Sequence, residues 1–220
     1  MTRNFMQADR QSTQRGIVLF FALIALLILT LAAAALIRSV DTTTLVAGNL
    51  AFKQAATHSG DAGIEAAINW LAATKGKAGV RNVFNDPNHP FNQDDPANGY
   101  YSGVHDNPSD PKYLDLFADD TWAADAKTSA LAGDDPDPAT GNTTRYIIQR
   151  MCQASNTVIQ STQCLFGGAA VNSSGRNIAL PQDICKGANC PAFGQIPLVR
   201  ITSRVTGPKN TVSYVQAFAY

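Results

Sequence analysis

The first part of the chain contains a long segment of apolar residues. From Ile17 to Ile37 every side chain is apolar except that of Thr30, and the segment ends at Arg38. About 20 consecutive apolar residues are what a helix needs to cross the hydrocarbon core of a bilayer. The pattern therefore predicts a membrane-spanning helix over residues 17–37 and a protein attached to a membrane.

A helical pattern continues beyond Arg38. Apolar side chains that recur at about 100° per residue predict one stripe on a helix. The stripe consists of Val46, Leu50, Ile64, Ala67, Ile68 and Leu71. Lys53 interrupts it, and each of the glycines at 48, 60 and 63 lowers helix propensity by about 1 kcal/mol relative to alanine.

Nothing in the sequence forces this helix to break before its predicted end. No proline occurs before Pro87, and Lys75 followed by Gly76 is typical of a helix end. We therefore predict one helix over residues 17–75, apolar on all sides in its first half and amphipathic over residues 38–75.

After Gly76 the pattern changes to turns and short strands. Residues 81–112 and 134–138 are rich in Asp-Pro, Asn-Pro and His-Pro dipeptides, which mark turns. We predict a short helix over residues 119–131, a strand over 145–151 and a possible second strand over 157–160. The clearest strand signal is at the C-terminus, where alternating residues predict a hairpin over residues 197–220.

The hairpin has one apolar and one polar face. The apolar face carries Val199, Ile201, Val205, Val215 and Ala217, and the polar face carries Arg200, Thr202, Arg204 and Gln216. The apolar face needs cover, and the amphipathic end of the helix can supply it. We predict an α+β fold in which one long N-terminal helix packs on a small C-terminal antiparallel sheet with long irregular loops. Residues 76–220 would form the globular head.

Charge indicates the orientation of the helix and excludes one class of function. Arg3, Arg10 and Arg15 precede the apolar segment, so the positive-inside tendency places the N-terminus in the cytoplasm and the head outside. The chain has 17 basic and 17 acidic residues and no basic cluster. It therefore offers no electrostatic reason to expect nucleic-acid binding.

Four cysteines lie in the head, where an oxidising compartment allows disulfides to persist. No two have CxxC spacing and the histidines are far from them in sequence, which favours disulfides over zinc. We predict the pairs Cys152–Cys164 and Cys185–Cys190, because each closes a short local loop. The other two possible pairings stay open.

The junction before the apolar segment resembles that of a type IV prepilin. Gln14-Arg15-Gly16 stands directly against the apolar helix, as in prepilin leaders. Further segments make the chain similar to the PilX-type minor pilins of type IV pili. They are Ala47-Gly48-Asn49-Leu50, Asp61-Ala62-Gly63-Ile64-Glu65-Ala66, Arg145 to Cys152, and Gly207 to Tyr214.

The resemblance implies how the N-terminus is processed and what it does afterwards. Prepilin peptidase would cut between Gly16 and Ile17, removing residues 1–16 and leaving an N-terminus that can be methylated. The helix would anchor the subunit in the bacterial inner membrane, with the head in the periplasm, and later enter the filament core. The core residues would include Ile17, Phe21, Leu26, Thr30 and Ile37.

One position departs from the general pilin pattern. Major pilins have a glutamate five residues after the cleavage point, and Phe21 stands there in this chain. That glutamate pairs with the buried N-terminal amine of a neighbouring subunit, and an ion buried without a partner is costly. A subunit lacking it cannot neutralise the amine of a subunit above, which indicates a place at or near the filament tip.

The resemblance implies a structural protein without a catalytic site or cofactor. It implies priming of pilus assembly, with effects on attachment and twitching motility. The partners would be other minor and major pilins, the inner-membrane assembly machinery, prepilin peptidase and a tip-associated adhesin. A minor pseudopilin of a type II secretion system is the nearest alternative. A single-pass periplasmic or secreted binding or enzymatic domain is another, and it predicts cleavage near Ala35 or none.

Two sets of residues have side chains that can bind metal ions. Calcium takes oxygen ligands, and Asp134, Asp135, Asp137, Gly141 and Asn142 are the best local candidates, although such residues are also common in turns. The histidines at 58, 89 and 105 have no metal-ligand spacing and are interpreted as ordinary surface residues. We interpret Trp70 and Trp122 as packing residues and Glu65 as a solvated or interfacial charge.

Overall fold

The structure, a computed structural model, describes residues 15–168, 174, 181–208 and 211–220. Residues 1–14 of the predicted leader, and Lys209 and Asn210 of the predicted hairpin turn, lie outside the described residues. The chain divides into two units, Met1–Phe52 and Lys53–Tyr220. The described part of the first unit is helical throughout, whereas the second contains the rest of the helix and a β-sheet.

The long helix is confirmed. Helix α1 runs over Arg15–Ala78, which extends the predicted 17–75 by two residues at the start and three at the end. It ends where Gly79 adopts a left-handed conformation (φ 62°), which glycine tolerates best. Lys75 and Lys77 lie in the last turn, where cations interact favourably with the helix dipole.

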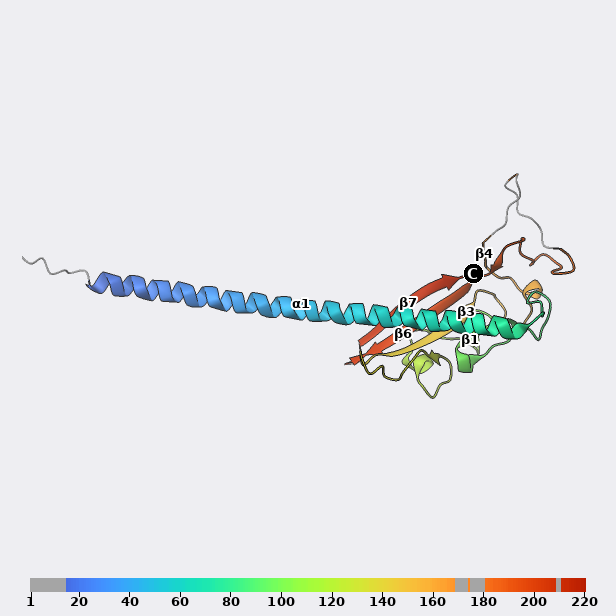
Figure 1. Cartoon of the computed structure of the whole chain (residues 1–220), viewed down its shortest axis with the longest axis horizontal. Coiled ribbons are helices and arrows are strands. Elements are labelled where there is room, and N and C mark those ends of the chain that lie inside the picture. Colours follow the sequence, from blue (N-terminus) through green and yellow to red (C-terminus); the bar gives the residue numbers. More distant parts are fainter. Residues whose placement is uncertain (1–14, 169–173, 175–180, 209–210) are drawn as a thin grey trace, which may run out of the picture. The chain divides into compact units, whose positions relative to one another are not determined.

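The predicted strand and hairpin form the three long strands of the sheet (Figure 1). Its main strands are β3 (Thr143–Arg150), β6 (Val199–Gly207) and β7 (Thr211–Ala219). β6 pairs antiparallel with both neighbours, from Thr143↔Thr206 to Arg150↔Val199 on one side and from Val199↔Ala219 to Gly207↔Thr211 on the other. The predicted α+β class and the antiparallel hairpin are therefore confirmed.

Short strands complete the sheet and make it mixed. β1 (Tyr100–Tyr101) pairs parallel with β3, and β2 (Ala130–Leu131) pairs antiparallel with it. β4 (Phe166–Gly167) and β5 (Ile196–Pro197) form a separate two-stranded sheet. The predicted antiparallel pairing is confirmed for the main strands. The parallel pairing of β1 was not predicted, because strands of two residues leave no periodic signal.

Two local predictions in the head are wrong. Residues 119–131, predicted as a helix, form only the 3₁₀ turn Asp119–Trp122 before the chain turns towards β2. The Trp122 indole donates to the Leu116 carbonyl (2.8 Å), which fixes the chain where a helix would continue. Residues 157–160, predicted as a strand, lead into the 3₁₀ turn Ile159–Ser161. The other 3₁₀ turns are Pro90–Asn92 and Pro96–Asn98.

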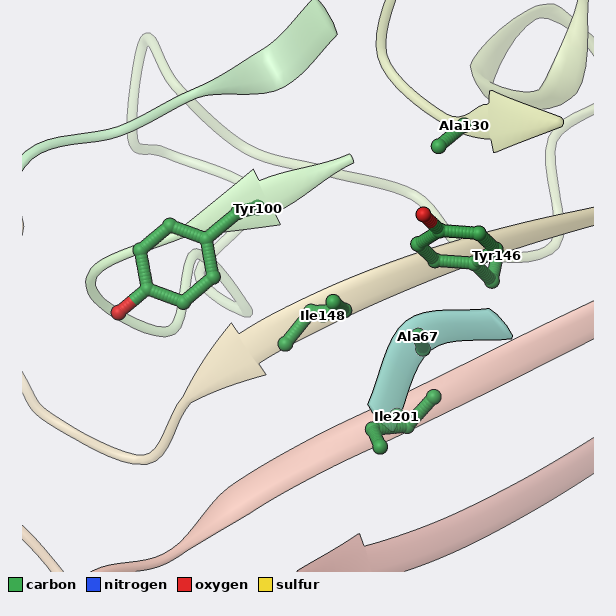
Figure 2. Packing of buried hydrophobic residues seen from close by; sticks show 6 residues of the cluster. All are labelled: Ala67, Tyr100, Ala130, Tyr146, Ile148 and Ile201. Atoms are coloured by element: carbon green, nitrogen blue, oxygen red, sulfur yellow. The ribbon is translucent and has the colours of Figure 1, made fainter. Parts of the chain in front are cut away.

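Within the second unit, α1 covers one face of the sheet, as Figure 2 shows around Ala67. Ala67 is fully buried, and Ile64 and Leu71 pack beside it, in agreement with the predicted stripe. Ile68 remains about half exposed, and Val46 and Leu50 are exposed in the first unit. The core on this face consists of Ala67, Tyr100, Ala130, Tyr146, Ile148 and Ile201.

The opposite face of the sheet is covered by loops. A second apolar cluster joins Ile147 of β3 to Tyr101, Leu114 and Trp122. Trp122 is only 3% exposed, so its interpretation as a packing residue is confirmed. Trp70 packs on the helix side, where its ring stacks on Tyr100 with 5.2 Å between centroids.

Candidate functional site

The apolar part of α1 is exposed on all sides within its own unit. Ile17, Phe21, Leu26 and Ile37 are each about 60% exposed, which is close to the maximum for side chains on an isolated helix. Thr30 satisfies its hydroxyl within the helix by donating to the Leu27 carbonyl (2.8 Å). The segment is long and apolar enough to span a membrane. It is therefore a candidate for membrane anchoring or export.

The proposed processing junction lies at the start of α1. Gly16 and Ile17 both belong to its first turn, which contains no acidic residue. Phe21, at the position where pilins carry glutamate, presents its ring at the surface of the helix. The first carboxylate after the junction is that of Asp41. An exposed apolar surface without a charge, as seen here, is compatible with hydrocarbon or with other apolar helices.

The two motif blocks on α1 lie in different units and have different surroundings. Ala47, Asn49 and Leu50 are exposed, and a β-carbon on Gly48 would meet no atom within 4 Å. Gly63 is buried, and a β-carbon there would lie 2.8 Å from Thr144 Cγ2 and even closer to the Ser203 hydroxyl. Asp61 is exposed. The second block therefore includes a contact point of the helix with the sheet.

Gly60 makes the same kind of contact one turn earlier. A β-carbon at this position would lie 3.1 Å from Val215 Cβ, and closer still to one of the methyl groups of that side chain. The helical pattern identified Gly60 and Gly63 as residues that weaken a helix, and the resemblance included Gly63 in a motif block without saying what it contacts. The structure shows what they contribute, which is a close approach of α1 to β6 and β7.

Both predicted disulfides are present. Cys152 bonds Cys164, immediately after β3, and Cys185 bonds Cys190. The first closes a loop that carries Thr157 and the turn at Ile159–Ser161. The described residues contain no free cysteine.

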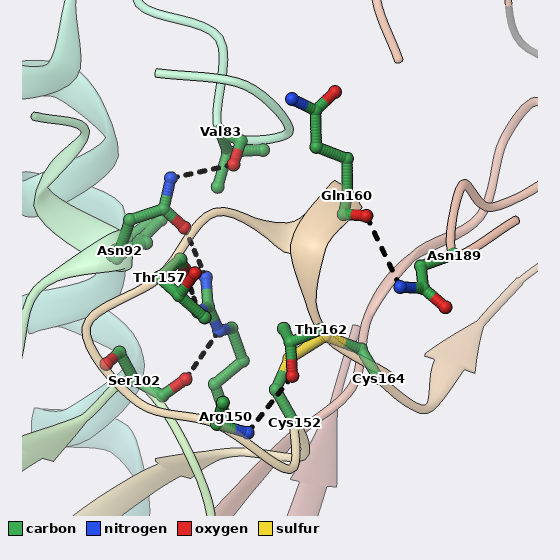
Figure 3. The surroundings of a disulfide bond; sticks show 12 residues. Val83, Asn92, Ser102, Arg150, Cys152, Thr157, Gln160, Thr162, Cys164 and Asn189 are labelled. Atoms are coloured by element: carbon green, nitrogen blue, oxygen red, sulfur yellow. Dashed lines mark hydrogen bonds between the residues drawn. A yellow bond between two sulfur atoms is a disulfide. The ribbon is translucent and has the colours of Figure 1, made fainter. Parts of the chain in front are cut away.

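Arg150, two residues before the first disulfide, is the most deeply buried charged side chain in the described residues, with 2% exposure (Figure 3). Its Nε donates to the Ser102 carbonyl (2.8 Å), Nη1 to Asn92 Oδ1 (2.6 Å) and Nη2 to the Thr157 carbonyl (3.0 Å). These partners come from three separate loops and are all neutral. Burial lowers the pKa of the guanidinium, although the nearby Asp94 acts in the opposite direction.

An apolar groove lies between three parts of the second unit: the last turns of α1, the end of β7 and the loop before β1. Its volume is about 430 Å³. Ile68, Leu71 and Ala72 line it from the helix, and Phe91 and Tyr100 from the loop and β1. Three basic side chains, Lys75, His89 and Arg150, also line it. No Asp or Glu side chain is among its described lining residues.

His89 and His105 contradict the prediction of surface histidines, since each is only 5% exposed. His89 Nδ1 accepts from the Phe91 backbone N–H (3.1 Å), which caps the 3₁₀ turn Pro90–Asn92 and places the proton of the neutral ring on Nε2. Burial lowers the pKa of His89, with Asp86 opposing this effect and Arg150 and Arg81 adding to it. His58 is exposed on α1, in agreement with the prediction.

The second buried histidine contacts a turn carboxylate. His105 Nδ1 lies 3.6 Å from Asp110 Oδ2. The pKa of Asp110 lies below its ordinary value, chiefly because the Lys112 backbone N–H donates to Oδ1 (2.8 Å). The His105–Asp110 contact therefore belongs to the turn in which Asp110 accepts from the Lys112 backbone N–H.

The calcium candidates make turn and sheet contacts. Asp137 accepts from the Ala139 backbone N–H (2.8 Å) and the Thr140 hydroxyl (3.1 Å), and Asn142 donates to the Ser59 hydroxyl (2.9 Å). Asp134 and Gly141 are exposed. Among the residues that the structure describes, no group of three His, Cys, Asp or Glu side chains is placed to hold a metal ion.

Three loop carboxylates pair with arginines on the sheet. Asp135 lies 3.4 Å from Arg145, Asp106 lies 2.9 Å from Arg200, and Asp119 contacts Arg204. The hairpin pattern predicted that Arg200 and Arg204 would lie on the polar face. The carboxylates that meet them are 94 and 85 residues away in sequence, so the pattern did not predict the partners.

The architecture is pilin-like: a long apolar N-terminal helix whose last turns pack on a mixed β-sheet. Comparison of the chain with protein-family models, with curated proteins and with solved structures found no match.

Proposed function

We propose that the protein is a structural subunit of a type IV pilus, a PilX-like minor pilin that primes or supports assembly of the filament. The observation that supports this most directly is that one helix, α1, supplies both an exposed apolar segment of membrane-spanning length and the cover of the sheet. The Gly16–Ile17 junction at its start adds the processing signal.

In this proposal the apolar segment has two successive environments. Before assembly it lies in the inner membrane, with the head and its two disulfides in the periplasm. During assembly it moves into a bundle of similar helices, where packing of apolar side chains replaces contact with lipid. Attachment and twitching motility are the processes that loss of such a subunit would impair.

The N-terminal sequence of the mature protein tests this proposal. Expression with prepilin peptidase should give a chain that begins at Ile17, and expression without it should leave residues 1–16 in place. Gly16→Val should block the cut and serves as the matched control. A mature chain that begins near Leu36 in both hosts would identify an ordinary secretory signal and a released domain instead.

We further propose that Phe21 restricts the subunit to the tip of the filament. A subunit without a carboxylate at this position cannot neutralise the buried amine of a subunit added above it. Labelled antibody against the head should therefore mark filament ends in the native strain, and Phe21→Glu should allow internal positions. Even, high-copy labelling along native filaments would exclude tip placement.

A further inference from the structure

The groove beside the end of α1 has the size and surface of a small-ligand site. Its volume of about 430 Å³ is in the lower part of the range of roughly 300–1,000 Å³ for such pockets. Ile68, Leu71 and Ala72 line it along the helix and form an apolar wall, and Phe91 and Tyr100 line it from the loop and β1. All of these residues belong to the second unit. A single flexible apolar chain fits this shape better than a two-chain lipid.

Arg150 gives the groove a charge that the protein does not neutralise. The guanidinium is 2% exposed, and its hydrogen-bond partners are two carbonyl oxygens and one amide oxygen. Among the described residues no carboxylate forms an ion pair with Arg150. The nearby Asp94 attracts its charge, but accepts hydrogen bonds from Ser102 and Asn156 instead. A buried cation without a counter-ion is costly. An anion in the groove would add to the attraction that Asp94 already exerts on this charge.

His89 and Lys75 are positioned to receive that anion. The Nδ1 of His89 is occupied by the Phe91 backbone N–H, so the ring offers Nε2–H as a donor. The His89 side chain lines the groove and is only 5% exposed. Lys75 lies at the exposed edge of the same groove. Three basic side chains therefore line a groove to which no Asp or Glu side chain of the described residues contributes.

We infer that this groove binds the anion of a medium-chain carboxylic acid. The apolar chain lies along the Ile68, Leu71 and Ala72 wall, and the carboxylate accepts hydrogen bonds from His89 Nε2 and Lys75 Nζ. Arg150, which also lines the groove, adds electrostatic attraction without giving up its own hydrogen bonds. The inference goes beyond the proposed function and does not depend on it.

Photolabelling of the full chain, with the labelled peptides mapped, tests the inference. Mapping is needed because the apolar part of α1 also binds fatty acids, without specificity. The probe is decanoate with a diazirine on its chain, and the matched neutral probe is the corresponding alcohol. Both are applied to the protein in a neutral detergent. We expect the carboxylate to label peptides that contain residues 68–75 at least five-fold more than the alcohol does. Labelling of residues 17–37 should not distinguish the two probes.

Three variants identify the site. Ala72→Trp fills the groove from an exposed helix position and should reduce labelling of residues 68–75 about ten-fold. Lys75→Gln should reduce it about three-fold. Lys77→Gln, in the same helix turn but outside the groove, should leave it unchanged. A thermal unfolding midpoint equal to that of the native chain shows that each variant is folded.

Several outcomes would overturn the inference. Equal labelling by the acid and the alcohol would remove the role of charge, and full labelling of Ala72→Trp would place the probe elsewhere. Displacement by dioctanoyl phosphatidylglycerol at the same concentration as by decanoate would identify a phospholipid site instead. Processing at Gly16–Ile17 is unaffected by any of these results, so the two proposals fail separately.

Discussion

Gly63 of α1 and Ser203 of β6 approach each other so closely that no room remains for a β-carbon on the helix at this point. The same β-carbon would lie 2.8 Å from Thr144 Cγ2, so two residues of the sheet would have to move to make room for it. Gly60 and Val215 repeat the contact one turn earlier. The glycines thus set the distance between the helix and the sheet, and with it the packing around Ala67.

Replacement of Gly63 tests this close approach. Gly63→Ala should lower the free energy of unfolding by about 1–3 kcal/mol through overpacking, despite the better helix propensity of alanine. Gly76→Ala is the control, because a β-carbon at Gly76 would meet no atom within 4 Å. It should raise stability by up to about 1 kcal/mol. Urea unfolding followed by tryptophan fluorescence measures both, and equal stability of the two variants would contradict the contact.

The hydrogen bonds of Arg150 predict that replacing the guanidinium by another cation of different shape lowers the stability of the head. Lysine keeps the charge but cannot donate to Ser102, Asn92 and Thr157 at once. Arg150→Lys should therefore destabilise the head by about 2–5 kcal/mol. Arg81→Lys, in a half-exposed pair 3.9 Å from Asp86, should cost less than about 1 kcal/mol. Similar urea midpoints for the two variants would argue against the role assigned to Arg150.

The two disulfides should differ in their contribution to stability. Cys152→Ser with Cys164→Ser opens a loop of sequence separation 12 and frees the segment around Thr157, an acceptor for Arg150. We expect a loss of about 2–4 kcal/mol. Cys185→Ser with Cys190→Ser opens a separation of only 5 and should cost less. Unfolding curves with and without reductant provide the measurement. A larger loss of stability from opening Cys185–Cys190 would show that loop-closure entropy is not the main contribution of these disulfides.

His89 predicts a loss of stability in mild acid. Its pKa in the folded protein lies below the ordinary value of 6.5, chiefly because the ring is buried. The unfolded chain therefore takes up a proton first as the pH falls through about 6.5, which favours unfolding. His89→Gln should reduce the slope of stability between pH 7 and 5, whereas the exposed His58→Gln should keep it. If both variants keep the native dependence of unfolding free energy on pH, groups other than His89 cause the loss of stability in acid.

Patterns with a fixed period predicted the framework of this molecule. The apolar repeat predicted α1 to within three residues at either end, and strict alternation predicted both the hairpin and the division of its faces. Local loop closure predicted the disulfide pairs correctly. Each of these features depends on residues that are near one another in sequence, where spacing carries the information.

Contacts between distant segments were not predictable in this way. Tyr100 and Tyr101 form too short a strand for any period, and their parallel pairing with β3 depends on the loops around them. The alanine-rich segment after Trp122 has good helix propensity, but tertiary contacts of the loop determine its path. Lys75, His89 and Arg150 come from a helix, a loop and a strand, so no motif could bring them together.

The three arginine–aspartate pairs determine how freely the outer loops can change. Arg145, Arg200 and Arg204 belong to the sheet, whereas their partners belong to loops and are 41–86% exposed. Each pair contributes little on its own. The loops between these anchor points can therefore differ in length and composition at little cost to the framework. The exposed turn at Ala124–Ala126 is a natural place for an inserted epitope or label.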